Sequence, residues 1–112
     1  MTHYAIKERT INDAVNEGGL LVVAQWEAKE GQAERIAGIL DRFLPQAQAE
    51  PGVKLFLISR ATDNPAQFLF YELFRDEAAF KAHQESAHFK SHIAGEALPL
   101  LAKRERAQYA LL

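Results

Sequence analysis

Residues Gln67–Phe74 read Q-F-L-F-Y-E-L-F, and this stretch decides the fold. Its aromatic content and its length of eight residues predict a β-strand. One face of the strand carries Phe68, Phe70, Glu72 and Phe74, and the other carries Leu69, Tyr71 and Leu73. A sheet with one solvated face alternates apolar and polar residues, so this pattern predicts that both faces of the strand are buried.

A second strand is predicted just before this one, at Val53–Arg60. Residues 62–65 between them read Thr-Asp-Asn-Pro, a run of turn formers, so the two strands should pair as a hairpin. Alternation along the second strand places Val53, Leu55 and Leu57 on one face and Phe56 and Ile58 on the other.

Helical patterns lie on both sides of the hairpin. Apolar residues recur at spacings of three and four over residues 33–47, and Pro45 predicts a bend or an early end there. After the hairpin, Asp76 and Ser86 are each placed to cap a helical stretch, the second of which Pro99 should disrupt.

Two further strands complete the pattern, at residues 20–28 and 103–112. The order β-α-β-β-α-β predicts an α+β, ferredoxin-like fold with a four-stranded antiparallel sheet and two helices on one face. This domain should span residues 19–112. Residues 1–18 read as a polar leader or arm, joined at the flexible pair Gly18–Gly19.

The apolar second face of the sheet predicts self-association. Two helices can cover only one face, and covering a large apolar side chain contributes about 1.5–3 kcal/mol. A second copy of the same sheet is the simplest cover, so the sequence predicts a homodimer.

Composition excludes several classes of protein. Thirteen basic against fifteen acidic residues give a net charge of −2, which disfavours general nucleic-acid binding. The chain has no cysteine, so disulfides, thiolate nucleophiles and iron–sulfur clusters are excluded. The apolar run Leu20–Ala24 has five residues, against roughly 20 for a membrane span. No secretory signal pattern opens the chain, and we expect a soluble, cytoplasmic protein without membrane or nucleic-acid partners.

Three of the four histidines, His83, His88 and His92, fall within ten residues and are the candidate catalytic groups. A zinc site is disfavoured, because His83 and His88 would be about 140° apart around a helix and no H-E-x-x-H occurs. An imidazole with a pKa near 6.5 can instead act as a general base at neutral pH. The alternative is that these histidines are hydrogen-bonded packing residues.

A pocket for a flat or carbonyl-bearing substrate would need apolar walls. The candidate binding residues are Trp26, Phe43, Phe56, Tyr71, Glu72 and Phe89. The aromatic residues could equally be plain core. Glu72 could pair with a histidine, with Arg60 or with Arg75, or could be a surface carboxylate. The basic stretch 103–106 is short and interrupted, and reads as a solvated strand end.

Several of these residues together resemble a known signature. Tyr71–Glu72, Asp76–Phe80, His83, Ser86 and His88–Phe89 are similar to the pattern of the antibiotic biosynthesis monooxygenase-like domain family. The resemblance covers residues 19–112 and implies a dimeric α+β barrel, in which two ferredoxin-like sheets face each other. It is greatest toward the branch of small quinol monooxygenases and autoinducer-2 isomerases.

The haem-degrading branch is disfavoured, because it relies on a first-strand Asn and a helical Trp. Here the first strand has Gln25, and the only Trp, Trp26, lies on that strand.

The resemblance implies a cofactor-free monooxygenase. In it His83 or His88 deprotonates a phenolic or quinol substrate, whose anion reacts directly with O2. One alternative is isomerisation of a phosphorylated carbonyl sugar by proton transfer, with the phosphate held by basic residues such as Lys81, Lys90, Arg60 or Arg75. Another is a dimer that binds a small ligand without turnover.

Overall fold

The structure is a computed structural model, and it describes residues 18–112. All of the predicted leader except Gly18 therefore lies outside the described residues. In chain order the elements are β1 (Leu20–Ala28), α2 (Ala33–Gln48), β2 (Val53–Arg60), β3 (Gln67–Phe74), α3 (Glu77–Glu85), the π-helix η1 (Phe89–Ala97), the short 3₁₀ helix η2 (Leu98–Leu100) and β4 (Leu101–Ala110).

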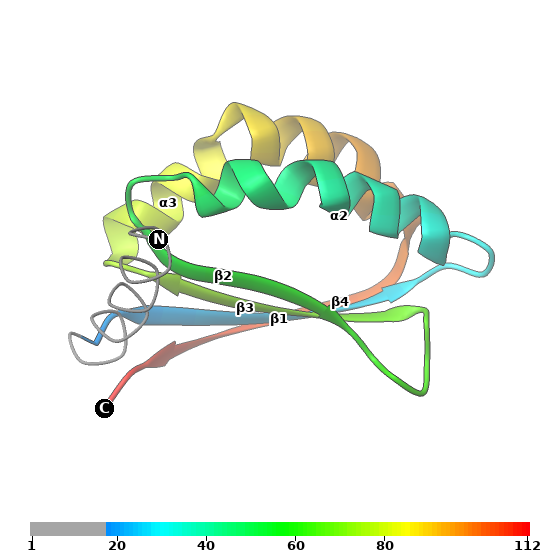
Figure 1. The fold of residues 1–112 in the computed structure, drawn as a ribbon, viewed down its shortest axis with the longest axis horizontal. Coiled ribbons are helices and arrows are strands. Elements are labelled where there is room, and N and C mark those ends of the chain that lie inside the picture. Colours follow the sequence, from blue (N-terminus) through cyan, green and yellow to red (C-terminus); the bar gives the residue numbers. More distant parts are fainter. Residues whose placement is uncertain (1–17) are drawn as a thin grey trace, which may run out of the picture.

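The four strands form one sheet in the order β2-β3-β1-β4, and every neighbouring pair is antiparallel. The helices of residues 18–112 all lie on one face of this sheet, and none of them covers the other face, which we call the open face (Figure 1). This confirms the predicted ferredoxin-like α+β fold. The last strand begins two residues before the predicted 103–112, at Leu101.

The core lies between the sheet and the helices. Val22, Ala24 and Trp26 of β1 are buried there, and so are Phe68, Phe70, Glu72 and Phe74 of β3. The prediction for Val53 is wrong. A bulge shifts the register between Val53 and Leu55, so Val53 packs against the helix-covered core while Leu55 packs on the open face.

The helix α2 does not end early at Pro45, because it continues to Gln48. Its buried positions follow the predicted spacing of three and four. They are Ile36, Ile39, Leu40, Phe43 and Ala47. A proline removes one backbone donor and disturbs one turn, and the burial of this face on the sheet outweighs that local cost.

The two predicted caps are confirmed. The Asp76 carboxylate accepts a hydrogen bond from the Ala79 backbone N–H at 2.8 Å. The Ser86 hydroxyl donates to the carbonyl of His83 at 2.7 Å and accepts from the Phe89 N–H at 3.2 Å. The stretch after Ser86 is a π-helix rather than an α-helix, and Pro99 lies in the 3₁₀ turn that follows it.

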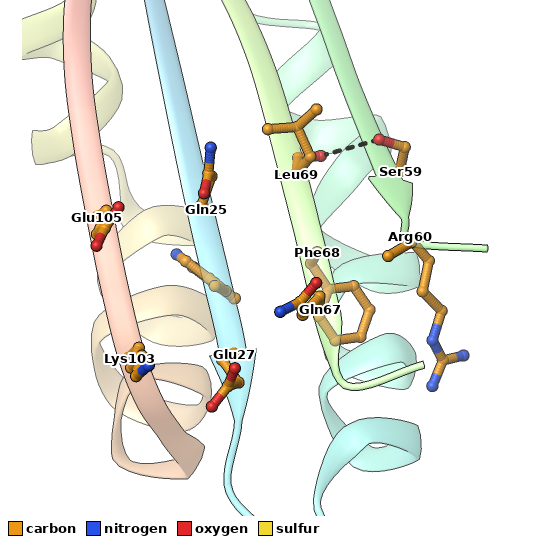
Figure 2. A pocket seen from close by; sticks show the side chains of 11 residues that line it. Gln25, Glu27, Ser59, Arg60, Gln67, Phe68, Leu69, Lys103 and Glu105 are labelled. Carbon is orange, nitrogen blue, oxygen red and sulfur yellow. Dashed lines mark hydrogen bonds between the residues drawn. The ribbon is translucent and has the colours of Figure 1, made fainter. Parts of the chain in front are cut away.

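The open face of the sheet carries large apolar side chains that no helix of the described residues covers. Leu57, Leu69, Tyr71 and Tyr109 are 50%, 41%, 37% and 53% exposed. At one end this face becomes polar and forms a hollow of about 380 Å³, where Gln25, Glu27, Lys103 and Glu105 gather (Figure 2). Within residues 18–112, no helix has the length and hydrophobicity to span a membrane.

Candidate functional site

The site is built around His83, a residue of α3 that is 2% exposed. Helix α3 is fixed at both ends, by the Asp76 cap and by the Ser86 hydroxyl on the His83 carbonyl. The imidazole is held as firmly as its backbone, because its Nδ1 lies 2.7 Å from the Glu50 Oε2. Glu50 comes from the turn between α2 and β2, so this hydrogen bond joins two distant parts of the chain.

His88 also contacts the Oε2 atom of Glu50. Its Nε2 lies 2.7 Å from the Glu50 Oε2. A carboxylate offers only acceptors, so the ring nitrogens of both histidines that contact Glu50 carry hydrogen. A neutral His83 with hydrogen on Nδ1 has its lone pair on Nε2. Glu50 therefore fixes the tautomer of His83 and the direction in which His83 can accept a proton.

The Nε2 atom of His83 points toward Glu72, a β3 residue that is 7% exposed. The Glu72 Oε1 lies 3.8 Å from this nitrogen, which is too long for a hydrogen bond. Burial raises the pKa of Glu72 to about 8, although Arg106 and Arg104 oppose the shift. Glu72 is therefore mostly protonated at neutral pH.

Burial also acts on His83, in the opposite sense. It lowers the pKa of the imidazole, and the hydrogen bond to Glu50 offsets part of this effect. A neutral base therefore faces a neutral acid. Two titratable groups whose environments drive their pKa values apart are typical of acid–base catalysis.

Aromatic rings enclose this pair. The ring centroid of His83 lies 5.3 Å from that of Phe56 and 5.2 Å from those of Phe74 and Phe89. A small cavity of about 20 Å³ lies beside His83 and Glu72, and we call it the His83 cavity. Such a volume suits one water molecule, so a substrate must displace side chains to enter.

Most of the predicted binding residues lie together. Trp26, Phe43, Phe56, Glu72 and Phe89 all line the His83 cavity. The placement of Tyr71 in this pocket is wrong, because Tyr71 lies on the open face of the sheet and is 37% exposed. Neighbouring strand residues point to opposite faces, so Tyr71 and Glu72 cannot share a pocket on one face.

The three predicted catalytic histidines are not all in one place. His83 and His88 meet at Glu50. His92 lies apart from them, with its Nδ1 3.0 Å from the Glu96 Oε1, and it does not line the cavity. Glu96 also accepts a hydrogen bond from Arg42 at 3.1 Å.

Three charged residues of the site were not predicted from the sequence. They are Glu50, Arg104 and Arg106. Glu50 falls in a turn, where no periodicity indicates the direction of a side chain. For the arginines a signal existed, because residues two apart on a strand share a face. The two arginines considered as partners of Glu72 bind elsewhere, whereas a histidine, His83, does face it. Arg60 contacts Glu34 at 2.6 Å, and Arg75 lies 3.6 Å from Asp76.

Glu50, His83 and His88 also form a donor set of a kind that binds zinc. Tetrahedral zinc, with bonds of about 2.0–2.1 Å, needs donor atoms about 3.4 Å apart. The Glu50 oxygen lies 2.7 Å from each imidazole nitrogen, which is hydrogen-bond spacing. A metal ion would therefore require the carboxylate to move away from both rings.

The larger hollow on the open face, shown in Figure 2, is a separate feature. Among the residues that line it there is no histidine. The acid–base groups of the described chain are concentrated in the smaller, buried cavity, and we assign the candidate site there.

Several solved structures have a similar fold. Among solved structures, the Pseudomonas aeruginosa protein PA3566 is 26% identical over 83% of this chain and 93% of its own, with a TM-score of 0.78. Protein SO0527 from Shewanella oneidensis is 24% identical over 81% of this chain and 88% of its own, with a TM-score of 0.75. A structure described as an antibiotic biosynthesis monooxygenase is 18% identical over 83% of this chain and 96% of its own, with a TM-score of 0.74.

No curated protein matches the sequence significantly. The sequence profile of the antibiotic biosynthesis monooxygenase family matches residues 19–95, which span β1 through most of η1. This chain therefore belongs to the antibiotic biosynthesis monooxygenase family.

Proposed function

We propose that the protein is a cofactor-free monooxygenase that oxidises a small phenolic or quinol-type substrate with O2. The observation that carries the proposal is the buried Glu50–His83 pair, whose free Nε2 faces Glu72 inside an aromatic cavity. A histidine held in one tautomer by a carboxylate is a recurring general base. Family membership supports oxygenation as the reaction.

In this mechanism His83 Nε2 accepts the hydroxyl proton of the substrate. The resulting anion gives one electron to O2, and recombination of the two radicals forms a C–O bond on the ring. In the proposed mechanism Glu72 donates its proton as the O–O bond breaks. One oxygen atom stays on the substrate, and the other leaves as water with two substrate hydrogens. The apolar walls keep bulk water from these intermediates.

We also propose that the active form is a homodimer joined through the open face. Leu57, Leu69, Tyr71 and Tyr109 form an apolar surface that a second copy of the sheet would cover. Two such sheets face to face would form the dimeric α+β barrel that the sequence resemblance implies.

Isomerisation is a second candidate, because the site contains an acid as well as a base. His83 could remove a proton from a hydroxyl-bearing carbon beside a ketone while Glu72 protonates the ketone oxygen, which gives an enediol. Return of the proton to the neighbouring carbon would complete the reaction without O2. The separation of 3.8 Å between the two groups favours this alternative over a role in ligand binding alone.

The test is oxygen uptake by chelator-treated protein with a panel of quinols and anthrones. His83→Ala should lose about 10²–10⁴-fold in rate. His92→Ala is the matched control, because it removes an imidazole bound to a carboxylate outside the cavity. Equal uptake by both variants would contradict the proposal. Absence of uptake by folded protein, with turnover of a carbonyl sugar phosphate, would support the isomerase instead.

A further inference from the structure

Two arginines of β4 stand at the edge of the His83 cavity. Arg104 and Arg106 both line it. The register of β4 on β1 sets Arg104 opposite Trp26 and Arg106 opposite Ala24, and both partners are buried residues of the helix-covered face. The two guanidinium groups therefore leave the strand on the same side as the acid–base pair. Both side chains remain exposed, so they stand where the cavity meets solvent.

These two charges have no counter-ion within the described part of the chain. Over residues 18–112, neither guanidinium forms a hydrogen bond or an ion pair with a carboxylate. Arg106 lies over the ring of Phe80, with 5.6 Å between its Cζ and the ring centroid. The acid whose charge interacts with both is Glu72, which burial keeps mostly protonated. Partial burial, together with repulsion from Arg106, lowers the pKa of Arg104.

We propose that Arg104 and Arg106 bind an anionic oxygen group, a carboxylate or a phosphate, carried by the substrate. This inference rests on the proposed function and names its substrate class. Two like charges held side by side repel each other, and an anion between them relieves that repulsion. A guanidinium presents parallel N–H donors that match the oxygens of a carboxylate or phosphate.

The position of the pair explains how such a substrate would be oriented. The anionic group would stay at the rim, where solvent still reaches the arginines. The aromatic or carbonyl part would enter between the rings toward His83, where burial of a charged group would be costly. The protein would then prefer a substrate with one charged end and one neutral, reactive end.

The test is a binding measurement in the absence of O2, so that no oxidation takes place. Isothermal titration would compare hydroquinone, 2,5-dihydroxybenzoate and hydroquinone monophosphate. We expect at least one of the two anions to bind about tenfold or more tightly than the neutral quinol. Arg104→Gln and Arg106→Gln should each remove most of this preference. The better of the two anions identifies the group that the substrate carries.

Lys103→Gln is the matched control, because Lys103 lies on the same strand but lines the hollow of the open face. It should leave the preference intact. Equal binding of all three compounds, no measurable binding of either anion, or an equal loss in Lys103→Gln would overturn the proposal. Anion preference without any oxygen uptake would support this inference while contradicting the oxygenase, so the two failures are distinguishable.

Discussion

The two faces of the sheet are built from the same strands but differ in how far their side chains are buried. On the helix-covered face, β3 contributes Phe70 and Glu72 to a closed core that contains the acid–base groups. On the open face, the neighbouring residues Leu69 and Tyr71 are 41% and 37% exposed. The helix-covered face therefore excludes water by its own folding, whereas much of the open face stays in contact with solvent, although Leu73 of the same strand is buried there. A single strand therefore places acid–base groups on one side and an exposed apolar surface on the other.

The largest effect should come from exchanging neighbours across this divide. Phe70→Asp places a carboxylate in a position that is 2% exposed, and we expect a loss of about 4 kcal/mol or more in unfolding free energy. Leu69→Asp should leave the fold intact but convert the proposed dimer to monomer. Urea unfolding and analytical ultracentrifugation measure the two results. A stable Phe70→Asp variant, or a Leu69→Asp variant that remains a dimer, would contradict the proposed difference between the two faces.

A second prediction concerns the two carboxylates that accept hydrogen bonds from histidine Nδ1 atoms. Glu50→Gln should lower kcat/KM by at least about tenfold, since the amide can also present an N–H to His83 and select the wrong tautomer. The pH dependence of the rate should shift to lower pH, because the imidazole loses its charged partner. Glu96→Gln makes the same change at His92, which is partly buried but lies outside the His83 cavity, and should alter neither measurement. Matching losses in both variants would show that burial does not distinguish the two pairs.

Glu72 should make stability depend on pH. Its pKa rises on folding from 4.5 to about 8, so the folded state holds a proton that the unfolded state releases. This contribution is full below about pH 4.5 and is lost as pH rises through 8, by a few kcal/mol in all. The lowered pKa of His83 has the opposite sign and destabilises the fold below pH 6.5.

The Glu72 effect is therefore isolated by unfolding measurements between pH 6.5 and 8. Over that range wild type should lose stability relative to Glu72→Gln, which cannot ionise. Glu105→Gln, on the exposed side of β4, should follow wild type. A constant difference between wild type and Glu72→Gln would mean that the carboxyl group is not buried as described.

The smallest expected effect is at the cap of α3. Asp76→Ala removes the acceptor for the Ala79 N–H and should cost about 1 kcal/mol in unfolding free energy. Asp41→Ala, at an exposed position inside α2, should cost nothing. Thermal unfolding of the pair would measure the difference. Identical melting temperatures for the two variants would show that the Asp76 cap does not help to fix the helix that carries His83.

The strands and helices could be predicted from the sequence, because their hydrophobic periodicities of two and of three to four residues reflect which side chains are buried. The bulge at Val53 could not be predicted. One extra residue in a strand moves the side chains before it to the opposite face of the sheet without changing the composition. The position of Tyr71 could have been predicted. Tyr71 and Glu72 are neighbours on one strand, so they point to opposite faces and cannot both line one pocket. Glu50 could not be found, because its role arises only when the turn after α2 meets α3.

The π-helix η1 has a consequence for chain length. Its backbone bonds join residues five apart, as in the bond from the Leu98 N–H to the Ile93 carbonyl. Deleting one residue here could be absorbed by a return to α-helical spacing, which would leave the segments at both ends in place. A deletion in α3 would instead turn His83 by about 100° away from Glu50. We therefore expect deletions among relatives to gather in η1 and to spare α3.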